Sequence, residues 1–478
     1  MYLLIAMMML FLCTCSKDEG FLSDSSRQDD LLKKAKTKAA VFPVSPNGVD
    51  DTQAIIDAFD EAKAAGPGSV VQLAEGEFRI GFIEIRDFYG YFRGAGRDMT
   101  KVRNLDVMPT TGDYFANNNT FPVLLCFVGG DVHVSKMTFA TTDGPVVPDD
   151  LYYGFLESFL NFADYTGQYT PPYRFIKGVV EEVDFIGGSF GGDNMIGTDH
   201  NIGMAVYVGS NVWVYGPNDP PYGSVDVTIK NCGFDHVGLG PDAFSLDERS
   251  TFVIENIISK NTIYDLFVGA SHGCKVYIRN NQFFESPVGT VLDDADLGLF
   301  PYIVLKKPTE YYVWGNYFER QSGSTILSLI DNRRATYPDE GSPQLFDIKG
   351  NTFITQEGGT AIYGLNNKDA KIWNNKFTGT GSIGVMIDGT EATDTWAENN
   401  NLIGNNFFDA TYTDASVYLG PYSMNCKVVG VAKDLVVDEG VNNSVIGTKA
   451  QKKGVQASQN LQNNLRNVHK NLMRRGRF

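Results

Sequence analysis

Two short apolar runs in the middle of the chain each lead into acidic residues and then into a loop that carries paired basic residues. The residues concerned are Asp293, Asp294 and Asp296 followed by Lys306 and Lys307, and Asp331 followed by Arg333 and Arg334. Carboxylates held close together raise one another's pKa, which prepares one of them to act as a general acid. We therefore take Asp293, Asp294 and Asp331 as candidate catalytic carboxylates.

The basic residues of the same loops suggest a second role for this region. The two lysines and two arginines could bind the carboxylate of an acidic sugar, and one of them with a depressed pKa could abstract the C5 proton in a β-elimination. Asp293, Asp294 and Asp296 could instead hold Ca²⁺, which needs several oxygen ligands. A solvated, self-neutralised charge cluster is the remaining alternative. Apart from Ca²⁺, the sequence points to no particular cofactor.

Acidic or amide residues also recur at an equivalent position in neighbouring segments. Aligning the phrases AFSLDE, FVGASHG, GTVLDD, ILSLIDN, AIYGLNN and GVMIDG places Asp247, His272, Asp293, Asp331, Asn366 and Asp388 at roughly one corner. We add Asp247 and His272 to the candidate substrate-binding residues, since a neighbouring histidine can assist proton transfer. For Asn366 and Asp388 a structural role in side-chain ladders and turns is favoured.

A repeated phrase that runs from about residue 228 to 445 carries these residues. Each copy has a few alternating apolar residues, an Asn-containing turn and a Phe, as in VTIKNCGF, VYIRNNQF and FDIKGNTF. The copies end at Phe234, Ile258, Phe283, Phe318, Phe353, Phe377 and Phe407, in steps of 24 to 35 residues. The period-two alternation predicts short strands, and a base repeat near 24 residues predicts a solenoid. In a parallel β-helix the equivalent side chains would stack at roughly 4.8 Å.

The segment at residues 47–96 predicts how the solenoid begins. Asp50 or Asp51 suits a helix start, and the helix would end at Gly66. Its apolar face would hold Ile55, Ile56, Phe59 and Ala62. Strands at 70–73 and 78–80 follow, and the R-G-A-G run at 93–96 reads as a coil corner.

This stretch resembles the N-terminal cap and first coils of the pectate-lyase-like right-handed β-helix superfamily. The resemblance implies an all-β fold, a right-handed parallel β-helix over residues 41–447 with an N-terminal capping helix. It implies little about chemistry, because the superfamily includes lyases, hydrolases, esterases, epimerases and non-enzymes. Gly197-Thr198-Asp199, Ser271-His272-Gly273 and Asp293-Asp294 resemble fragments of the polygalacturonase signature, but in the wrong order. No catalytic residue is carried over from a family.

The N-terminal residues resemble the signal of a bacterial lipoprotein. Residues 1–14 are almost wholly apolar but too short to span a bilayer comfortably, and Leu12-Cys13-Thr14-Cys15 is similar to a lipobox with Cys15 as the lipidated residue. The Ser-Lys-Asp-Glu that follows resembles the surface-export signal of Bacteroidetes lipoproteins. The resemblance implies a signal peptide over 1–15, a polar tether over 16–40, and an outer-membrane lipoprotein exposed at the cell surface that contacts the membrane only through its lipid anchor.

The charge distribution limits the classes of partner. The 478-residue chain has a formal charge of −17, and the tail from residue 449 onward contains eight Lys or Arg and no acid. An acidic body disfavours nucleic acid as a partner. The tail, 448–478, is either a second capping helix, with Leu461, Leu465, Val468 and Leu472 on one face, or a disordered basic segment.

Three loop-like segments interrupt the early coils at 106–122, 141–178 and 214–223. The second is rich in aromatic residues, including Tyr152 and Tyr153, and flat rings stack well on sugars. The leading hypothesis is a cell-surface, carbohydrate-active β-helix protein, a polysaccharide lyase or glycoside hydrolase acting on an acidic or plant-type glycan. The alternative is a non-catalytic glycan-binding protein or adhesin that uses Tyr152 and Tyr153. A purely structural envelope protein is a third hypothesis.

Overall fold

The computed structural model describes most of the chain from residue 39 to residue 447. The described ranges are 39–106, 123–141, 156–163, 175–188, 202–209, 225–244, 246, 249–269, 273–293, 308–320, 323–331, 344–404 and 406–447. The expectations for the signal peptide at 1–15, for nearly all of the tether at 16–40 and for the tail at 448–478 concern residues outside these ranges, so they stay predictions. No helix within the described ranges has the length and apolar character needed to cross a membrane.

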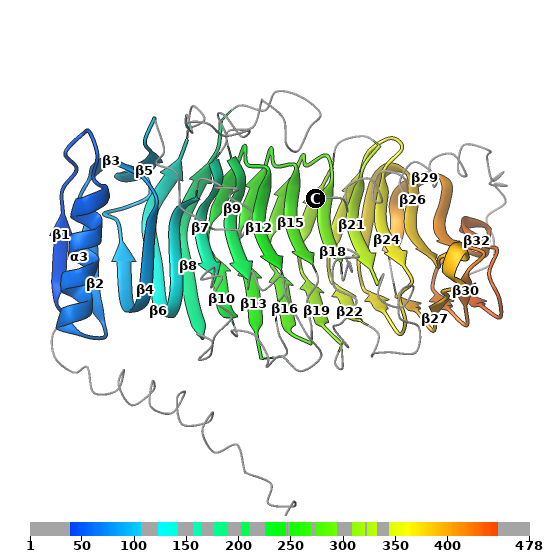
Figure 1. Ribbon diagram of the computed structural model, residues 1–478. Helices are drawn as coiled ribbons and strands as arrows, with labels where there is room; N and C mark the ends of the chain where they lie inside the picture. Colours follow the sequence, from blue (N-terminus) through cyan, green and yellow to red (C-terminus); the bar gives the residue numbers. More distant parts are fainter. Residues whose placement is uncertain are drawn as a thin grey trace, which may run out of the picture.

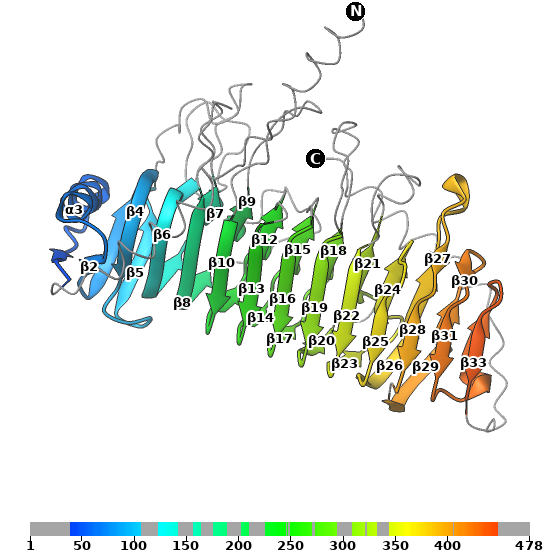
Figure 2. The same ribbon diagram turned by 90° about the horizontal axis from the view of Figure 1, so that it is seen from below.

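The described strands wind into one long parallel solenoid, the β-helix that the repeats predicted (Figure 1). Each full coil contributes a strand segment to each of three parallel ladders, and Figure 2 shows the coils following one another from the N-terminal helix to the last strands. Four short elements near the C-terminal end complete the described structure: β27 (Ala397–Glu398), β30 (Ser423–Met424), η1 (Glu391–Thr393) and η2 (Lys433–Leu435).

The first ladder contains the apolar part of each repeated phrase. It comprises β1 (Val41–Val44), β2 (Ser69–Leu73), parts of β4 (Ile83–Arg93), β6 (Val123–Ala140) and β8 (Ile176–Ile186), then β10 (Val225–Lys230), β13 (Thr251–Glu255), β16 (Lys275–Arg279), β19 (Glu310–Trp314), β22 (Leu345–Lys349), β25 (Lys371–Trp373), β28 (Asn401–Ile403), β31 (Lys427–Val429) and β33 (Ser444–Ile446).

The second ladder contains the Phe that ends each phrase. It comprises β3 (Gly76–Ile80), β5 (Thr100–Asn104), the ends of β6 and β8, then β11 (Gly233–Asp235), β14 (Ile258–Lys260), β17 (Gln282–Phe284), β20 (Tyr317–Glu319), β23 (Thr352–Thr355), and the starts of β26 (Lys376–Asp388) and β29 (Asn406–Leu419).

The third ladder closes each coil. It comprises the starts of β4 and β6, β7 (Leu156–Ala163), β9 (Ile202–Gly209), β12 (Leu239–Phe244), β15 (Tyr264–Gly269), β18 (Gly289–Asp293), β21 (Thr325–Ile330), β24 (Thr360–Leu365), the ends of β26 and β29, and β32 (Val436–Asp438).

The helix α3 (Thr52–Ala65) covers the N-terminal end of the solenoid, as the sequence predicted (Figure 1). Its fully buried residues are Ile55, Ala58, Phe59 and Ala62, and Ile56 is partly buried and packs against the same core. The Phe59 ring contacts Phe88 in β4 with centroids 4.9 Å apart. Without the helix, the first coil would expose its apolar end and an unpaired strand edge. The helix covers this end, so the edge is not available to pair with another chain.

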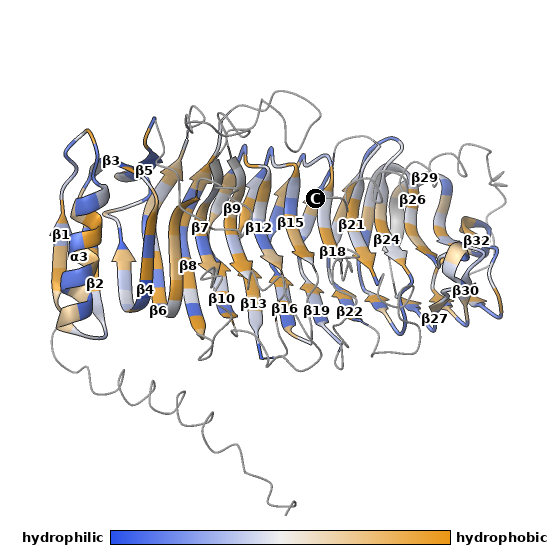
Figure 3. Ribbon diagram, viewed as in Figure 1, coloured by the Kyte–Doolittle hydropathy of each residue, from blue (hydrophilic) through white to orange (hydrophobic). Residues whose placement is uncertain are grey.

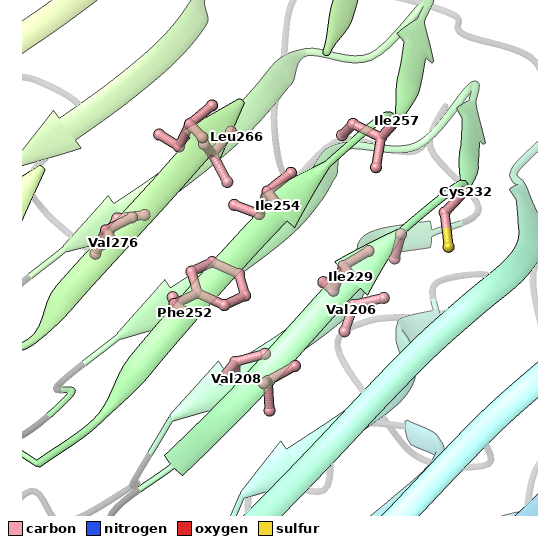
Figure 4. Close-up of a cluster of buried hydrophobic side chains, with 14 of the residues drawn as sticks. Val206, Val208, Ile229, Cys232, Phe252, Ile254, Ile257, Leu266 and Val276 are labelled. Carbon is pink, nitrogen blue, oxygen red and sulfur yellow. The ribbon is translucent and has the colours of Figure 1, made fainter. Parts of the chain in front are cut away.

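Apolar and polar residues alternate along the strands, and the apolar set faces the interior (Figure 3). Valine, isoleucine and leucine from successive coils form the core together with Cys232, as the close-up in Figure 4 shows. The four cysteines Cys126, Cys232, Cys274 and Cys426 are buried, where a cysteine packs as a small apolar residue.

The expected stack of phenylalanines forms in the second ladder, with one correction. Phe283, Phe318 and Phe353 stack with centroids 4.9 and 5.1 Å apart. The sequence alignment placed Ile258 in this row, but β14 pairs Ser259 with both Phe234 and Phe283. Ile258 was therefore wrong by one position, and its side chain is 47% exposed. The side chain of Phe407 lies outside the described residues.

The asparagine turns of the repeated phrase combine two different functions. The first turn residue adopts a left-handed conformation, for example at Asn256 (φ 54°) and Asn374 (φ 54°). The next residue points inward, and four such residues, Asn281, Asn316, Asn351 and Asn375, form a buried ladder. The Nδ2 of each of the first three donates to the Oδ1 of the next asparagine at 2.9–3.0 Å, so the amide groups link consecutive coils.

Candidate functional site

The predicted acidic corner is only partly described by the structure. The side chains of Asp247, His272, Asp293, Asp294, Asp296, Lys306, Lys307, Arg333, Arg334, Tyr152, Tyr153 and Cys15 lie outside the described residues. The backbone of Asp293 is described, and it pairs with Ile330 in β21. Asp331 therefore lies in the next coil, one position beyond the residue that pairs with Asp293.

Asp331 is fully buried at the end of β21. Its Oδ2 accepts a hydrogen bond from the backbone N of Gln344 at 3.0 Å, and its backbone N donates to Leu365 at 3.0 Å. Its Oδ1 has no hydrogen-bond partner among the described residues. The Asp331 carboxylate thus bonds the residue that precedes β22, where the chain returns from the third ladder to the first. The assignment of Asp331 to catalysis stays a hypothesis.

Asn366 and Asp388 bond neighbouring turns, in line with the structural interpretation. Asn366 has φ 59°, and its Oδ1 accepts from the Thr390 hydroxyl at 3.0 Å. The Oδ1 of Asp388 accepts from the backbone N of Gly389 at 2.8 Å and of Tyr422 at 3.1 Å. Burial raises the pKa of Asp388 to about 6. Asp388 pairs with Leu365, so it too lies one position away from Asn366.

A different site is present on the outside of the first ladder. A cavity of about 380 Å³ extends over four successive coils at the corner between the first and second ladders. We call it the corner groove. Its lining residues are Arg279, Asn280, Trp314, Gly315, Lys349, Gly350, Trp373 and Asn374.

Strand register explains why these residues meet. Arg279, Trp314, Lys349 and Trp373 are the last residues of β16, β19, β22 and β25, and they pair in one row across the ladder. Side chains alternate between the two faces of a strand, so this row points outward while Ile278 and Val313 point into the core. The turn residues that follow, such as Gly315 (φ 67°), bend the backbone away and leave the space open.

Asp347 holds both indoles in place. It precedes Lys349 by two residues, so it lies on the same face of β22. Its Oδ2 accepts from Trp314 Nε1 at 3.1 Å, and its Oδ1 accepts from Trp373 Nε1 at 2.7 Å. One carboxylate therefore orients two rings that belong to the coils on either side of it. Such charge-assisted hydrogen bonds are stronger than those between neutral groups.

Two cations lie among these rings. The Lys349 Nζ is 3.8 Å from the centroid of Trp314 and 5.2 Å from that of Trp373. Among the described residues Lys349 has no carboxylate within salt-bridge distance. The charge of Arg279 is partly neutralised, because its NH2 atom lies 3.0 Å from a Glu255 carboxylate oxygen. Its Nε has no hydrogen-bond partner within the described ranges.

Two tyrosines extend the aromatic surface beside the groove. Tyr277 and Tyr312 stack with centroids 4.9 Å apart, and Tyr312 contacts Trp314 edge-on at 5.1 Å. The Tyr312 hydroxyl donates to Glu310, and this hydrogen bond is the main reason that the pKa of Tyr312 rises to about 12. Tyr312 therefore stays protonated at neutral pH and offers an apolar ring rather than a base.

The sequence analysis did not identify the corner groove, because it assigned the candidate site to the insertions that follow the third-ladder strands. The signal was nevertheless present in the aligned phrases. VYIRNNQF, YYVWGNYF, FDIKGNTF and AKIWNNKF have R, W, K and W at the same position, directly before the turn. A search for metal ligands among the described residues finds no group of three or more His, Cys, Asp or Glu suited to a cation. The residues expected for Ca²⁺ lie outside that search.

A comparison with family models found no match, and neither did a search of curated proteins. Among solved structures, a mutant of DFA-IIIase from Arthrobacter chlorophenolicus A6 matches with a TM-score of 0.50 and 11% identity, covering 88% of this chain and 98% of that chain. The Streptococcus pneumoniae surface protein and adhesin PfbA has a TM-score of 0.48 and 13% identity, with 86% and 100% covered. The A-module of the Azotobacter vinelandii mannuronan C-5 epimerase AlgE6 has a TM-score of 0.40 and 14% identity, with 84% and 97% covered.

At these identities the DFA-IIIase match supports the fold alone. Together with the strand topology it establishes the right-handed parallel β-helix that the resemblance to the pectate-lyase-like superfamily implied. Fold does not determine activity, because unrelated functions occur on one scaffold. The function therefore has to be argued from the corner groove.

Proposed function

We propose that this protein binds a polysaccharide with carboxylate groups along the corner groove. The observation that carries the proposal is the position of Lys349, a cation without an ion-pair partner among the described residues, between the indoles of Trp314 and Trp373. Flat aromatic rings provide a large apolar contact area with little loss of conformational entropy, which suits the C–H faces of sugars. The cations add selectivity for an anionic chain.

The overall charge supports a local site rather than a diffuse attraction. The formal net charge of −17 repels a polyanion, so an acidic glycan needs contacts where positive side chains are concentrated. Arg279 and Lys349 lie two coils apart on the first ladder. Short-range pairing in the groove can offset the long-range repulsion, because the Debye length is only about 8 Å at physiological salt.

Binding to immobilised polygalacturonate tests the proposal directly. Trp373→Ala should weaken binding at least tenfold, equivalent to about 1.4 kcal/mol. Tyr91→Ala is the matched control, because Tyr91 is a 43% exposed aromatic on the outer face of the same ladder, in β4, well outside the corner groove. Equal binding by both variants and the wild type would reject the groove as the site.

Cleavage of a glycan is the second candidate function, as the sequence first suggested, and it would take place at the third ladder, away from the corner groove. The observation in its favour is Asp242 in β12, which is 7% exposed and whose Oδ1 has no hydrogen-bond partner in the part of the chain that the structure describes. Burial raises the pKa of Asp242 to about 8, so the group keeps its proton at neutral pH and has the protonation state of a general acid. Unsaturated products or new reducing ends in the binding assay would indicate a lyase or a hydrolase.

A further inference from the structure

The outside of the third ladder is apolar near the C-terminal end of the solenoid. Four residues from four consecutive coils pair there in one row: Tyr363, Met386, Tyr418 and Val437. Their neighbours along the strands, such as Val385 and Ile387 on either side of Met386, belong to the interior core. Because side chains alternate between the two faces of a strand, the row of four points outward. We call these four residues the outer third-ladder face.

This face is largely closed to water, although no described element lies over it. Tyr363, Met386 and Tyr418 are 3–5% exposed, whereas Ile403, on the outside of the first ladder, is 41% exposed. The main contacts of β24, β26 and β29 are with neighbouring strands of the solenoid and with η2, which leads into β32. Strands that are apolar on both faces need a second layer. That layer has to come from residues beyond the described ranges or from a partner.

The segment after Gly447 has the sequence of a helix with one apolar side. Its apolar residues recur at spacings of four, three and four: Leu461, Leu465, Val468 and Leu472. On a helix they would extend over about 16 Å, and four consecutive coils extend over about 14 Å. An isolated helix of this length is marginal in water, so it needs a surface to pack on.

The connection to this helix is long enough to reach the outer third-ladder face. Thirteen residues separate Gly447 from Leu461. Fully extended they span up to about 43 Å, whereas one side of a coil, a strand of five or six residues, measures about 17–20 Å. The chain can therefore pass around the last coil and turn back along the solenoid.

The charges of the two surfaces are opposite. Glu439 accepts a hydrogen bond from the Tyr418 hydroxyl at 2.8 Å. Burial, this bond and the negative charges of Glu439 and Asp388 raise the pKa of Tyr418. The segment from residue 449 onward carries eight Lys or Arg and no acid. Three of them precede the helix and would pass these carboxylates: Lys449, Lys452 and Lys453.

The alternative position for such a helix, as a cap on the last coil, fits the exposure of the residues less well. Val445 in the last first-ladder strand pairs with Val428, and Val445 is only partly buried against the core. Its neighbour Ile446 is 53% exposed. The end of the solenoid is thus partly open, while the outer third-ladder face is covered.

We propose that residues 448–478 fold back from the last coil and lie as a helix along the outer third-ladder face. The apolar side of the helix packs on the four residues of that face, and the lysines before it neutralise Asp388 and Glu439. The inference does not rest on the proposed function, because the corner groove is on the outside of the first ladder.

Photocrosslinking on the full chain tests the position of the helix. The photoreactive residue p-benzoylphenylalanine replaces Leu465 on the apolar side or, as the control, Asn463 on the opposite side. We expect the Leu465 probe to give adducts within one molecule on peptides that contain Tyr363, Met386, Tyr418 or Val437, in several-fold higher yield than the Asn463 probe. Adducts on the last coil, adducts between two molecules, equal yields from both probes or no adduct would each overturn the proposal.

A matched pair of charge variants gives an independent readout. Leu465→Glu places a charge on the apolar side of the helix and should release it, so binding of the dye ANS to the exposed face should rise about twofold or more. Asn463→Glu adds the same charge on the opposite side and should leave ANS binding at the wild-type level. Both residues lie outside the solenoid strands, so both variants should keep the wild-type circular dichroism of the strands. Equal ANS binding by the two variants would contradict the docking of this helix.

Discussion

Arg320 donates a hydrogen bond to the carboxylate of Asp265, a residue 55 positions earlier in the chain, and both side chains are buried inside the solenoid. The pair is part of a wider polar network. Asp265 also accepts from Ser259 at 3.1 Å and from Thr262 at 3.0 Å, and Arg320 NH1 donates to the carbonyl of Ser286 at 2.8 Å. Ser259 occupies the position that Phe holds in the adjacent coils, so the gap in the aromatic stack coincides with this network.

We expect Asp265→Ala to be among the most destabilising single changes in the protein. It leaves the Arg320 guanidinium buried without its counter-charge, and breaking such a pair costs about 3–5 kcal/mol. The double variant Asp265→Ala, Arg320→Met should lose less stability than Asp265→Ala alone, because no unpaired charge remains. Urea unfolding followed by tryptophan fluorescence measures both, and a double variant less stable than the single one would contradict the argument.

Asn351→Ala should interrupt the asparagine ladder. The Oδ1 of Asn351 accepts from the backbone N of Asn316 at 2.9 Å and from Asn316 Nδ2 at 3.0 Å, and its Nδ2 donates to the Val313 carbonyl at 2.8 Å. Because each buried polar group left without a partner costs about 1–3 kcal/mol, we expect a loss of roughly 2–4 kcal/mol in the free energy of unfolding.

The matched control for the ladder is Asn256→Gly. Asn256 precedes an equivalent corner, is exposed and has φ 54°, a conformation that glycine adopts freely. We expect this change to alter stability by only a few tenths of a kcal/mol. A similar loss in both variants would show that the turn conformation, and not the buried amide ladder, provides the stabilisation.

Asp242 predicts a pH dependence of stability. Its pKa is raised to about 8 by burial, from the ordinary value of 3.8 for an aspartate carboxyl, so between about pH 4 and pH 8 the folded state binds more protons than the unfolded state. This contribution to stability is present at low pH and is lost as the pH rises through that window. Asp242→Asn should therefore match the wild type near pH 4 and exceed it by a few kcal/mol at pH 8. A stability difference that stays constant from pH 4 to pH 8 would contradict the assignment.

The sequence by itself was sufficient to predict the architecture, because the residues that define one coil lie close together in the chain. Alternating apolar residues, an Asn turn and a Phe occur within eight residues, as in FDIKGNTF, and the same eight residues form a strand, a left-handed corner and a stacked ring. The N-terminal helix was equally readable from its start signal and apolar face. The alignment error that placed Ile258 where the structure has Ser259 occurred in the copy of the phrase that lacks the Phe.

The tertiary structure decided which coils bring which side chains together. The insertions between strands differ in length, so spacing along the chain placed Asp293 and Asp331 at roughly one corner but did not define the pairing of Asp293 with Ile330. Arg279, Trp314, Lys349 and Trp373 are separated by 35, 35 and 24 residues, yet hydrogen bonding between parallel strands places them in one row. A one-residue change of register moves a side chain to the opposite face of its ladder. The corner groove therefore depends on the strand register, which the whole stack of coils determines together.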